Sequence, residues 1–317
     1  MTTPPTPQLT GIVVHWHDED RLAELVAAWP GDEGLELVIV DNGSKRQLPT
    51  QAWVLTPAGN LGFAGAVNLG LQATRAPLVL IMNSDVCPQP GALAALVRAG
   101  DRWPGAAALA PRLVGTDGAS QYSWQLRSLP TVATLVLQCL FLPVTGERRA
   151  EPRAGEPVEQ PAAAALCVRR QILDQLGGFD EAFYPAWFED VDLAKRMKSA
   201  NLPIRYCPDA EFVHHLGSSI PLLGYGSFLR SYYANLCRYL GKHHGRFWAS
   251  TARLLLIPAA LLRLAWLPIR CPKRARSRRQ AASGLWGLAL DAASGWRRAS
   301  ADSSPDTSSL DRDGGQG

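Results

Sequence analysis

Three carboxylates, Glu189, Asp190 and Asp192, fall within four residues and follow a run of aromatic side chains between residues 183 and 188. A carboxylate held beside an incoming hydroxyl group can take its proton, which is general base catalysis. The ordinary alternative is structural, because acidic residues in the first turn of a helix are stabilised by its free N–H groups and its dipole. The local sequence is compatible with both explanations.

Polar clusters also follow apolar runs elsewhere in the chain. Asp-Asn-Gly-Ser occupies residues 41–44, Asn-Ser-Asp occupies residues 83–85, and two adjacent histidines stand at 214 and 215. Each cluster comes directly after a run of apolar residues that predicts a β-strand. Open α/β sheets bind ligands at the carboxyl ends of their strands. We therefore expect these clusters to gather around one ligand.

The elements that would position these clusters alternate between strand and helix, which predicts an α/β fold with a mostly parallel central sheet. Glycines at 59, 62, 65 and 70 lack the G-x-G-x-x-G spacing of a dinucleotide site. They indicate either close packing of a helix on the strands or approach of the backbone to a nucleotide. The predicted strands cover residues 10–16, 35–40, 53–55, 77–82, 106–113, 162–168, 204–207 and 211–215. The predicted helices cover 21–29, 88–99 and 171–176, and the run 59–70 is expected to open a further helix.

Charge divides the 317-residue chain into two parts. Residues 1–220 hold 17 Lys and Arg against 23 Asp and Glu, whereas residues 221–300 hold 14 against 1. A strongly basic, apolar region favours an anionic membrane surface as partner. We predict a disordered lead over 1–9, a catalytic domain over 10–220, a basic amphipathic helical extension that associates with membranes over 221–298, and a disordered tail over 299–317.

The apolar segments are too short or too interrupted to predict a membrane span. Residues 129–144 predict an interfacial or acceptor-facing helix, and residues 146–161 a surface loop. Residues 254–269 are broken by Pro258, Arg263 and Pro268 and precede the basic run 271–279, which predicts an interfacial anchor. A buried helix with a solvated basic linker is the alternative. Six scattered cysteines and no signal peptide favour a cytoplasmic protein, peripheral on the inner face of the cell membrane.

A nucleotide-diphosphate sugar would use all of these clusters. Asp41 would accept a hydrogen bond from a uracil or thymine imide, and Asp85 would hold a divalent cation that bridges the diphosphate. His214 or His215 would complete the cation site, and Asp190 would take the proton of the acceptor hydroxyl. No nucleic acid partner is expected.

Four motifs resemble the family 2 glycosyltransferases of GT-A fold, in particular the rhamnosyltransferase-like branch, over about residues 10–220. They are Val-Ile-Val-Asp-Asn-Gly-Ser, Asn-x-Gly-Phe-Ala-Gly-Ala-x-Asn-x-Gly, Asn-Ser-Asp-Val and Gly-Gly-Phe-Asp-Glu followed by Glu-Asp-Val-Asp-Leu-x-x-Arg, in the family's order.

The resemblance implies an inverting enzyme that moves a sugar, rhamnose being one candidate, to a hydroxyl of a surface polysaccharide or lipid-linked glycan precursor. It implies nucleotide contacts at Asp41, Asn60, Asn68 and Asp85. Asp190, with Glu189 beside it, matches the catalytic base, and a Mg²⁺ or Mn²⁺ ion would lie at Asp85, His215 and His214.

Two positions depart from the family's pattern. The metal motif Asn83-Ser84-Asp85 has one carboxylate where relatives have two, and Ala163 replaces a glycine that relatives usually carry near the donor. The first departure leaves the metal's identity open, and the second leaves the sugar open.

Two other classes of protein were considered. A nucleotidyltransferase would need a Gly-rich, basic loop after its first strand, but residues 15–20 are acidic here. A non-catalytic, membrane-associated nucleotide-sugar-binding module would be expected to lack Asp85 or Asp190, and both are present.

Overall fold

The computed structural model describes residues 6–32, 34–44, 48, 52–144, 150–216 and 223–296. The chain forms two compact units, one of residues 1–131 with 144–219 and one of residues 132–143 with 220–317. Residues 1–5 of the predicted lead and all of the predicted tail lie outside the described residues. The first strand begins at Leu9, which is the last residue of the predicted lead.

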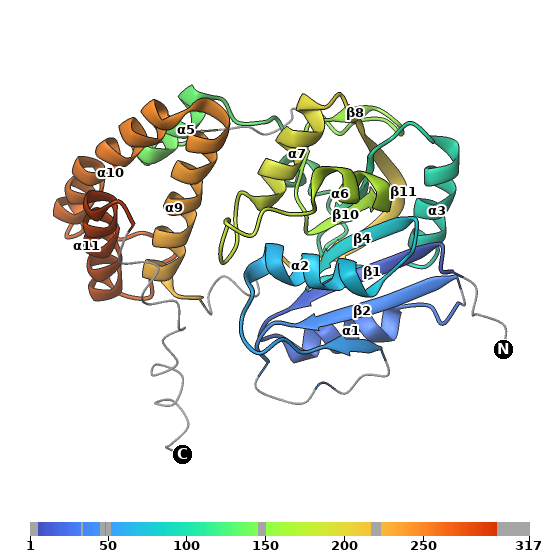
Figure 1. Ribbon diagram of the computed structural model, residues 1–317. Helices are drawn as coiled ribbons and strands as arrows, with labels where there is room; N and C mark the ends of the chain where they lie inside the picture. Colours follow the sequence, from blue (N-terminus) through green and yellow to red (C-terminus); the bar gives the residue numbers. More distant parts are fainter. Residues whose placement is uncertain are drawn as a thin grey trace, which may run out of the picture. The chain divides into compact units, whose positions relative to one another are not determined.

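The first unit is built on a sheet of order β3-β2-β1-β4-β10-β6-β11-β5 (Figure 1). The first four strands of this order run parallel, and β10 lies antiparallel between β4 and β6. The predicted α/β fold is thereby confirmed. The strands are β1 (Leu9–His15), β2 (Leu35–Asp41), β3 (Trp53–Leu55), β4 (Leu78–Asn83), β5 (Val86–Pro88), β6 (Ala108–Val114), β10 (Ala165–Arg169) and β11 (Ile204–His214).

Helices cover both faces of this sheet, which explains why its strands are continuous apolar runs. One hydrophobic core lies between the sheet and α2 (Gly62–Ala73), α6 (Arg170–Leu176) and α7 (Glu189–Ser199). The other lies between the sheet and α1 (Glu19–Ala28) and α3 (Ala92–Arg102). Ile12 and Val13 of β1 are fully buried, one in each core.

Packing accounts for two of the glycines that resembled a nucleotide fingerprint. A Cβ atom on Gly70 would lie 2.5 Å from Cγ2 of Ile12, so this glycine lets α2 approach β1 closely. Gly62 has a φ of +70°, and a Cβ there would lie 2.8 Å from the carbonyl oxygen of Pro185. These contacts favour close packing over backbone approach to a nucleotide.

Two expectations about local structure were wrong. Residues 150–161 are not simply a surface loop, because β8 (Pro157–Val158) pairs with β11 and β9 (Gln160–Pro161) pairs with β7 (Leu126–Arg127). Backbone pairing buries Val158 and Gln160 despite the polar composition of the segment. The two predicted closing strands form the single strand β11, whose pairing with β6 shifts register after Cys207.

The second unit is helical and contains α5 (Val132–Cys139), α9 (Tyr225–His244), α10 (Arg246–Trp266) and α11 (Arg278–Ser294) (Figure 1). Helices α9 and α11 cross closely at two glycines, since a Cβ on Gly284 would lie 3.0 Å from Cα of Gly226. Asp291 of α11 is buried, and its carboxylate lies 3.8 Å from Arg230. The predicted helical extension is therefore present.

Helix α10 continues through Pro258, where an interruption was expected. Proline removes the hydrogen bond to the carbonyl four residues earlier. That carbonyl belongs to Leu254, which is 61% exposed, so solvent can reach it. Within the described residues α10 is the helix long and apolar enough to cross a membrane, with a mean hydropathy of 1.3. One such helix is weak evidence for a span.

Candidate active site

Asp41 closes β2 and organises the turn that follows. Its Oδ1 accepts hydrogen bonds from the backbone N–H groups of Ser44, at 2.8 Å, and Gly43, at 3.3 Å. Such a turn is the ordinary role of an aspartate after a strand. It also fixes the carboxylate at the carboxyl edge of the sheet, where a nucleotide base could reach it.

His15 lies beside Asp41 and was missed by sequence reasoning. The two residues are register partners in the parallel pair β1 and β2. His15 is fully buried, and its ring nitrogens have no hydrogen-bond partner among the described residues. Burial lowers the pKa of His15 more strongly than the charge of Asp41 raises it, so the imidazole is neutral at neutral pH. The signal available in the sequence was that a histidine ends the first apolar strand, just as Asp41 ends the second.

Asn60 shapes the loop before α2. Its Oδ1 accepts hydrogen bonds from the Asn42 side chain, at 3.0 Å, and from the N–H of Gly62, at 2.8 Å. Asn42, itself buried, accepts from the N–H of Leu61 at 2.7 Å. These bonds hold the chain between β2 and α2 in one conformation.

Asn68 ties α2 to the Gly-Gly-Phe-Asp-Glu segment. Its Nδ2 donates to the carbonyl of Phe179, at 2.9 Å, and to Glu181, at 2.8 Å, while its Oδ1 accepts from the N–H of Phe179 at 2.9 Å. Both amide hydrogens are thus used within the protein. Asn60 and Asn68 therefore position their own segments through these bonds, and their contacts with a nucleotide stay a prediction.

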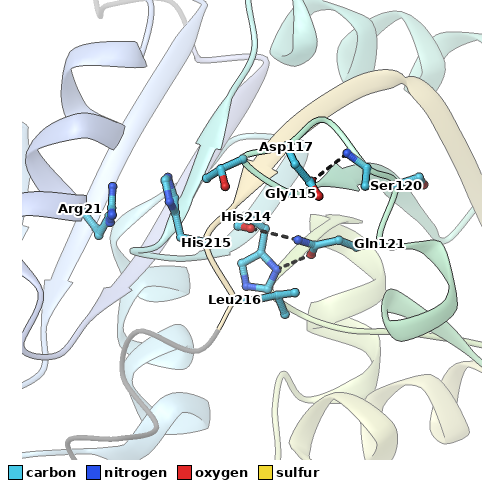
Figure 2. Close-up of a pocket in the computed structure, with 10 residues that line it drawn as sticks. Arg21, Gly115, Asp117, Ser120, Gln121, His214, His215 and Leu216 are labelled. Carbon is cyan, nitrogen blue, oxygen red and sulfur yellow. Dashed lines mark hydrogen bonds between the residues drawn. The ribbon is translucent and has the colours of Figure 1, made fainter.

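Asp85 and His214 face each other at the end of β4 and β11. Both are buried, and Nε2 of His214 lies 3.7 Å from Oδ1 of Asp85. Gln121 fixes the imidazole, because its Nε2 donates to the carbonyl of His214 at 3.0 Å and its Oε1 lies 2.8 Å from Nδ1 (Figure 2). Nδ1 therefore carries the proton, and Nε2 presents a lone pair to the carboxylate.

This arrangement fits a divalent cation. A carboxylate oxygen and a neutral imidazole nitrogen that face each other are both electron donors, and a cation between them would satisfy both. Burial lowers the pKa of His214, opposed by the charge of Asp85, so the neutral form is favoured. A mixed oxygen and nitrogen donor set is compatible with Mn²⁺ as well as with Mg²⁺.

The structure separates the two histidines that the sequence placed together. Nε2 of His215 lies 3.6 Å from Oε2 of Glu24, with Cys87 close by. In Figure 2 the His215 ring lies beside Arg21, whereas the His214 ring lies beside Gln121. Both histidines line a pocket of about 580 Å³. The geometry therefore favours His214 over His215 as the partner of Asp85.

The three carboxylates at the start of α7 have different surroundings. Asp192 is fully buried and accepts a hydrogen bond from Nε of Arg196 at 2.7 Å. Arg196 also donates to the carbonyls of Leu176 and Gly178, so this pair is structural. Asp190 is half-buried, and its Oδ2 accepts from the N–H of Ala163 at 3.3 Å.

Burial raises the pKa of both Glu189 and Asp190, and the charge of Asp190 adds to the effect on Glu189. Backbone N–H groups of Ala163 and Val191 and the charge of Arg127 oppose the rise at Asp190. Oε2 of Glu189 has no hydrogen-bond partner among the described residues. Glu189 is therefore the residue of the pair that holds a proton more readily, and Asp190 the one that is ionised.

Backbone strain accompanies this pair. Trp187 and Phe188 have φ values of +74° and +73°, in the left-handed region that side-chain-bearing residues rarely adopt. Each such residue costs about 1–3 kcal/mol, and strain of this kind gathers at functional sites. Ala163, the residue that departs from the family's glycine, lies against Asp190. Its backbone N–H therefore contacts the carboxylate that was predicted to be the base.

Comparison with known proteins gives consistent matches. The family model described as glycosyltransferase like family 2 matches residues 7–238. An N-acetylglucosaminyl-diphospho-decaprenol L-rhamnosyltransferase of Mycobacterium tuberculosis is 32% identical over 83% of this chain and 92% of its own length. A pre-mycofactocin glycosyltransferase of the same organism is 30% identical, over 57% of this chain and 37% of its own length.

Among solved structures, a mannosyltransferase of Pyrobaculum calidifontis in complex with GDP-Man and Mn²⁺ has a TM-score of 0.50. It is 16% identical, and the match covers 92% of this chain and 87% of the other. At this identity the likeness concerns the fold.

Proposed function

This chain belongs to glycosyltransferase family 2, and we propose that it transfers a sugar, with inversion, from a nucleotide-diphosphate donor to a hydroxyl of a lipid-linked glycan precursor. The observation that carries this proposal is the pair of adjacent acids at the start of α7, of which Asp190 accepts hydrogen bonds from backbone N–H groups that favour its ionised form. Membership of the family favours sugar transfer over the nucleotidyltransferase alternative.

The reaction is a single displacement at the anomeric carbon. Asp190 takes the proton of the acceptor hydroxyl as its oxygen bonds to that carbon, and the bond to the nucleoside diphosphate breaks. Glu189, protonated beside it, removes the repulsion that a second charge would create. Asp192 and Arg196 hold the first turn of α7 in place.

Asp85 and His214 would hold the divalent cation, Mg²⁺ or Mn²⁺. When bound, the cation supplies positive charge that stabilises the leaving diphosphate. Gln121 positions His214 by fixing its tautomer. The solved mannosyltransferase with Mn²⁺ supports a divalent cation in this fold.

We place the nucleotide base at the ends of β1 and β2. Asp41 offers a carboxylate oxygen to the imide N–H of uracil or thymine, and neutral His15 lies buried beside Asp41 as its register partner. Asn60 and Asn68 position this region through their internal hydrogen bonds.

We base the proposed donor and acceptor on the name of the Mycobacterium tuberculosis relative. That relative is an L-rhamnosyltransferase acting on an N-acetylglucosaminyl-diphospho lipid, and it matches most of this chain. We propose the same classes of donor and acceptor here. A panel of nucleotide sugars, incubated with a short-chain lipid-diphospho-N-acetylglucosamine, tests the proposal through the nucleoside diphosphate released and the product mass. Release with a nucleotide-rhamnose is expected, and a glycosylated product with another sugar alone would reject the rhamnose assignment.

The acceptor's lipid requires the enzyme to work at the cytoplasmic membrane surface, and the second unit offers a face for it. Helix α10 buries Ala252, Leu256 and Ala260 on one side. Its opposite side exposes large apolar residues at helical spacing, namely Phe247, Leu254, Leu261 and Leu262. We call this exposed side the apolar face of α10. A helix with one face packed on protein and the other apolar and exposed suits a position in the membrane plane.

Basic residues accompany this face, with Arg270, Lys273, Arg274, Arg276, Arg278 and Arg279 between α10 and the start of α11. We propose that this surface binds anionic lipid without spanning the bilayer. Each basic residue near such a surface contributes about 1 kcal/mol. Arg263 is held against α5, where it donates to the carbonyl of Phe141 at 3.1 Å.

Leu262→Glu should weaken binding of the full chain to anionic vesicles by about 10-fold, because a charge replaces an inserted apolar side chain. Trp53→Glu is the matched control, since Trp53 is an exposed apolar residue of the first unit. Co-sedimentation with anionic vesicles measures the binding of both variants. Equal loss in the two variants would contradict the proposed face. Raising salt should weaken binding further, whereas resistance to alkaline extraction would indicate a span.

A further inference from the structure

A row of three side chains joins the cation site to the catalytic base, and we call it the Trp124 row. The ring of Trp124 lies 5.1 Å from the ring of His214, with 39° between the planes. Cζ of Arg127 also lies near this ring, 5.7 Å from the Trp124 ring centroid. Because His214 faces Asp85, one end of the row lies at the cation site.

Backbone pairing brings the other end of the row to Asp190. Arg127 is the register partner of Gln160 in the two-stranded sheet β7-β9. Directly after β9, the N–H of Ala162 donates to the carbonyl of Gln125, and the N–H of Ala163 donates to Asp190. The charge of Arg127 also opposes the rise in the pKa of Asp190. Arg127 is therefore a cation beside the catalytic carboxylate.

The guanidinium of Arg127 is held in place by the protein, and its terminal nitrogens can still bind a ligand. Its Nε donates to the carbonyl of Trp124 at 2.8 Å, and its plane is further restrained by the tryptophan ring. Its two terminal nitrogens make no hydrogen bond to any residue that the structure describes, and the side chain is exposed. A planar fork held in this way matches a phosphate group in two-point contact.

We propose that Arg127 binds the diphosphate of the acceptor, the group that joins the acceptor sugar to its lipid, and that Trp124 positions Arg127. This inference rests on the proposed function. The acceptor hydroxyl must meet Asp190, so the acceptor sugar occupies the space beside that residue. The donor diphosphate belongs at the other end of the row, with Asp85 and His214. A cation on the Asp190 side therefore meets the acceptor's anionic group.

The test compares two acceptors, a short-chain prenyl-diphospho-N-acetylglucosamine and a neutral octyl N-acetylglucosaminide. Arg127→Gln should lower the ratio of kcat/KM for the first to kcat/KM for the second by about 10- to 100-fold, as expected for loss of charge-assisted hydrogen bonds. The ratio cancels any effect on Asp190, since the base serves both acceptors. Arg127→Lys should recover part of the ratio, because it restores charge without the fork.

Arg102→Gln is the matched control, because Arg102 is another exposed arginine stacked on a tryptophan, with Cζ 5.3 Å from the Trp103 ring. It should leave the ratio unchanged. An unchanged ratio in Arg127→Gln would overturn the inference. A raised KM for the donor with an unchanged ratio would do the same and assign Arg127 to the donor diphosphate.

Equilibrium binding of the diphosphate acceptor separates this inference from the proposed function. If the wild type transfers sugar to neither acceptor, the proposed acceptor class is wrong. Titration of the wild type and Arg127→Gln with the same compound still decides the role of Arg127. Binding that is about 10-fold weaker in the variant supports the role, and equal or undetectable binding by both rejects it.

Discussion

Asp190→Asn lowers the rate of sugar transfer by about 10²- to 10⁴-fold, the usual contribution of a positioned general base. Asparagine keeps an oxygen that can accept the hydrogen bond from Ala163, so the local structure should persist. The substitution acts on the acceptor hydroxyl, and donor binding should change little. Steady-state rates and a separate titration with the donor nucleotide measure the two effects.

The matched control is Asp209→Asn, an exposed acid on β11 in the same unit. It should retain transfer. Near-normal turnover in Asp190→Asn would contradict the assignment and make Glu189 the candidate. Asp192 is a poor candidate because Arg196 already binds it.

The pH dependence of kcat/KM should test the same assignment independently. The base works only when ionised, and burial disfavours the ionised form, which raises the pKa of Asp190. Activity should therefore be full above that raised pKa and fall as the pH drops through it. The acid limb of the profile should lie above the range of an exposed aspartate, and it should disappear in Asp190→Asn.

Removal of divalent cations, or Asp85→Ala, should lower transfer by about 10²- to 10³-fold, because a bound cation contributes several kcal/mol of charge stabilisation. In the wild type, excess chelator should abolish activity and added Mn²⁺ or Mg²⁺ should restore it. The activity of Asp85→Ala should respond little to added cation, because one of the two residues that would hold the cation is gone. The affinity for the nucleotide-sugar donor should fall as well, since the cation would supply positive charge to its diphosphate.

The two histidines provide an internal comparison. His214→Ala should raise the cation concentration needed for half-maximal activity far more than His215→Ala, because His214 faces Asp85 and His215 faces Glu24. Full activity in excess chelator would rule out the cation role for the whole site. A larger effect from His215→Ala would reverse the assignment made from the geometry.

The sequence alone determined the sheet and the places where chemistry would gather. Strands buried on both faces must be apolar throughout, so runs such as Ile12–Val14 and Val38–Val40 were readable without a structure. Polar residues at their ends, including Asp41 and Asp85, stood out for the same reason. The charge division between residues 1–220 and 221–300 likewise needed only counting.

Only the tertiary structure separated residues that are neighbours in sequence. His214 and His215 are adjacent at the end of β11, but consecutive residues of an extended chain point to opposite sides. One therefore meets Asp85 and the other Glu24. Glu189, Asp190 and Asp192 are likewise distinguished by contacts with distant residues, of which Ala163 and Arg196 are the clearest.

The Trp124 row is a second arrangement that the sequence alone could not reveal. Its members lie in segments separated by about ninety residues along the chain, and sequence patterns carry information about spacing within one helix or strand. The pairing of β7 with β9 and the position of α4 (Tyr122–Gln125) against β11 bring Arg127, Trp124 and His214 into line. Such juxtapositions depend on long-range packing, because no local periodicity encodes which distant segments come to lie side by side.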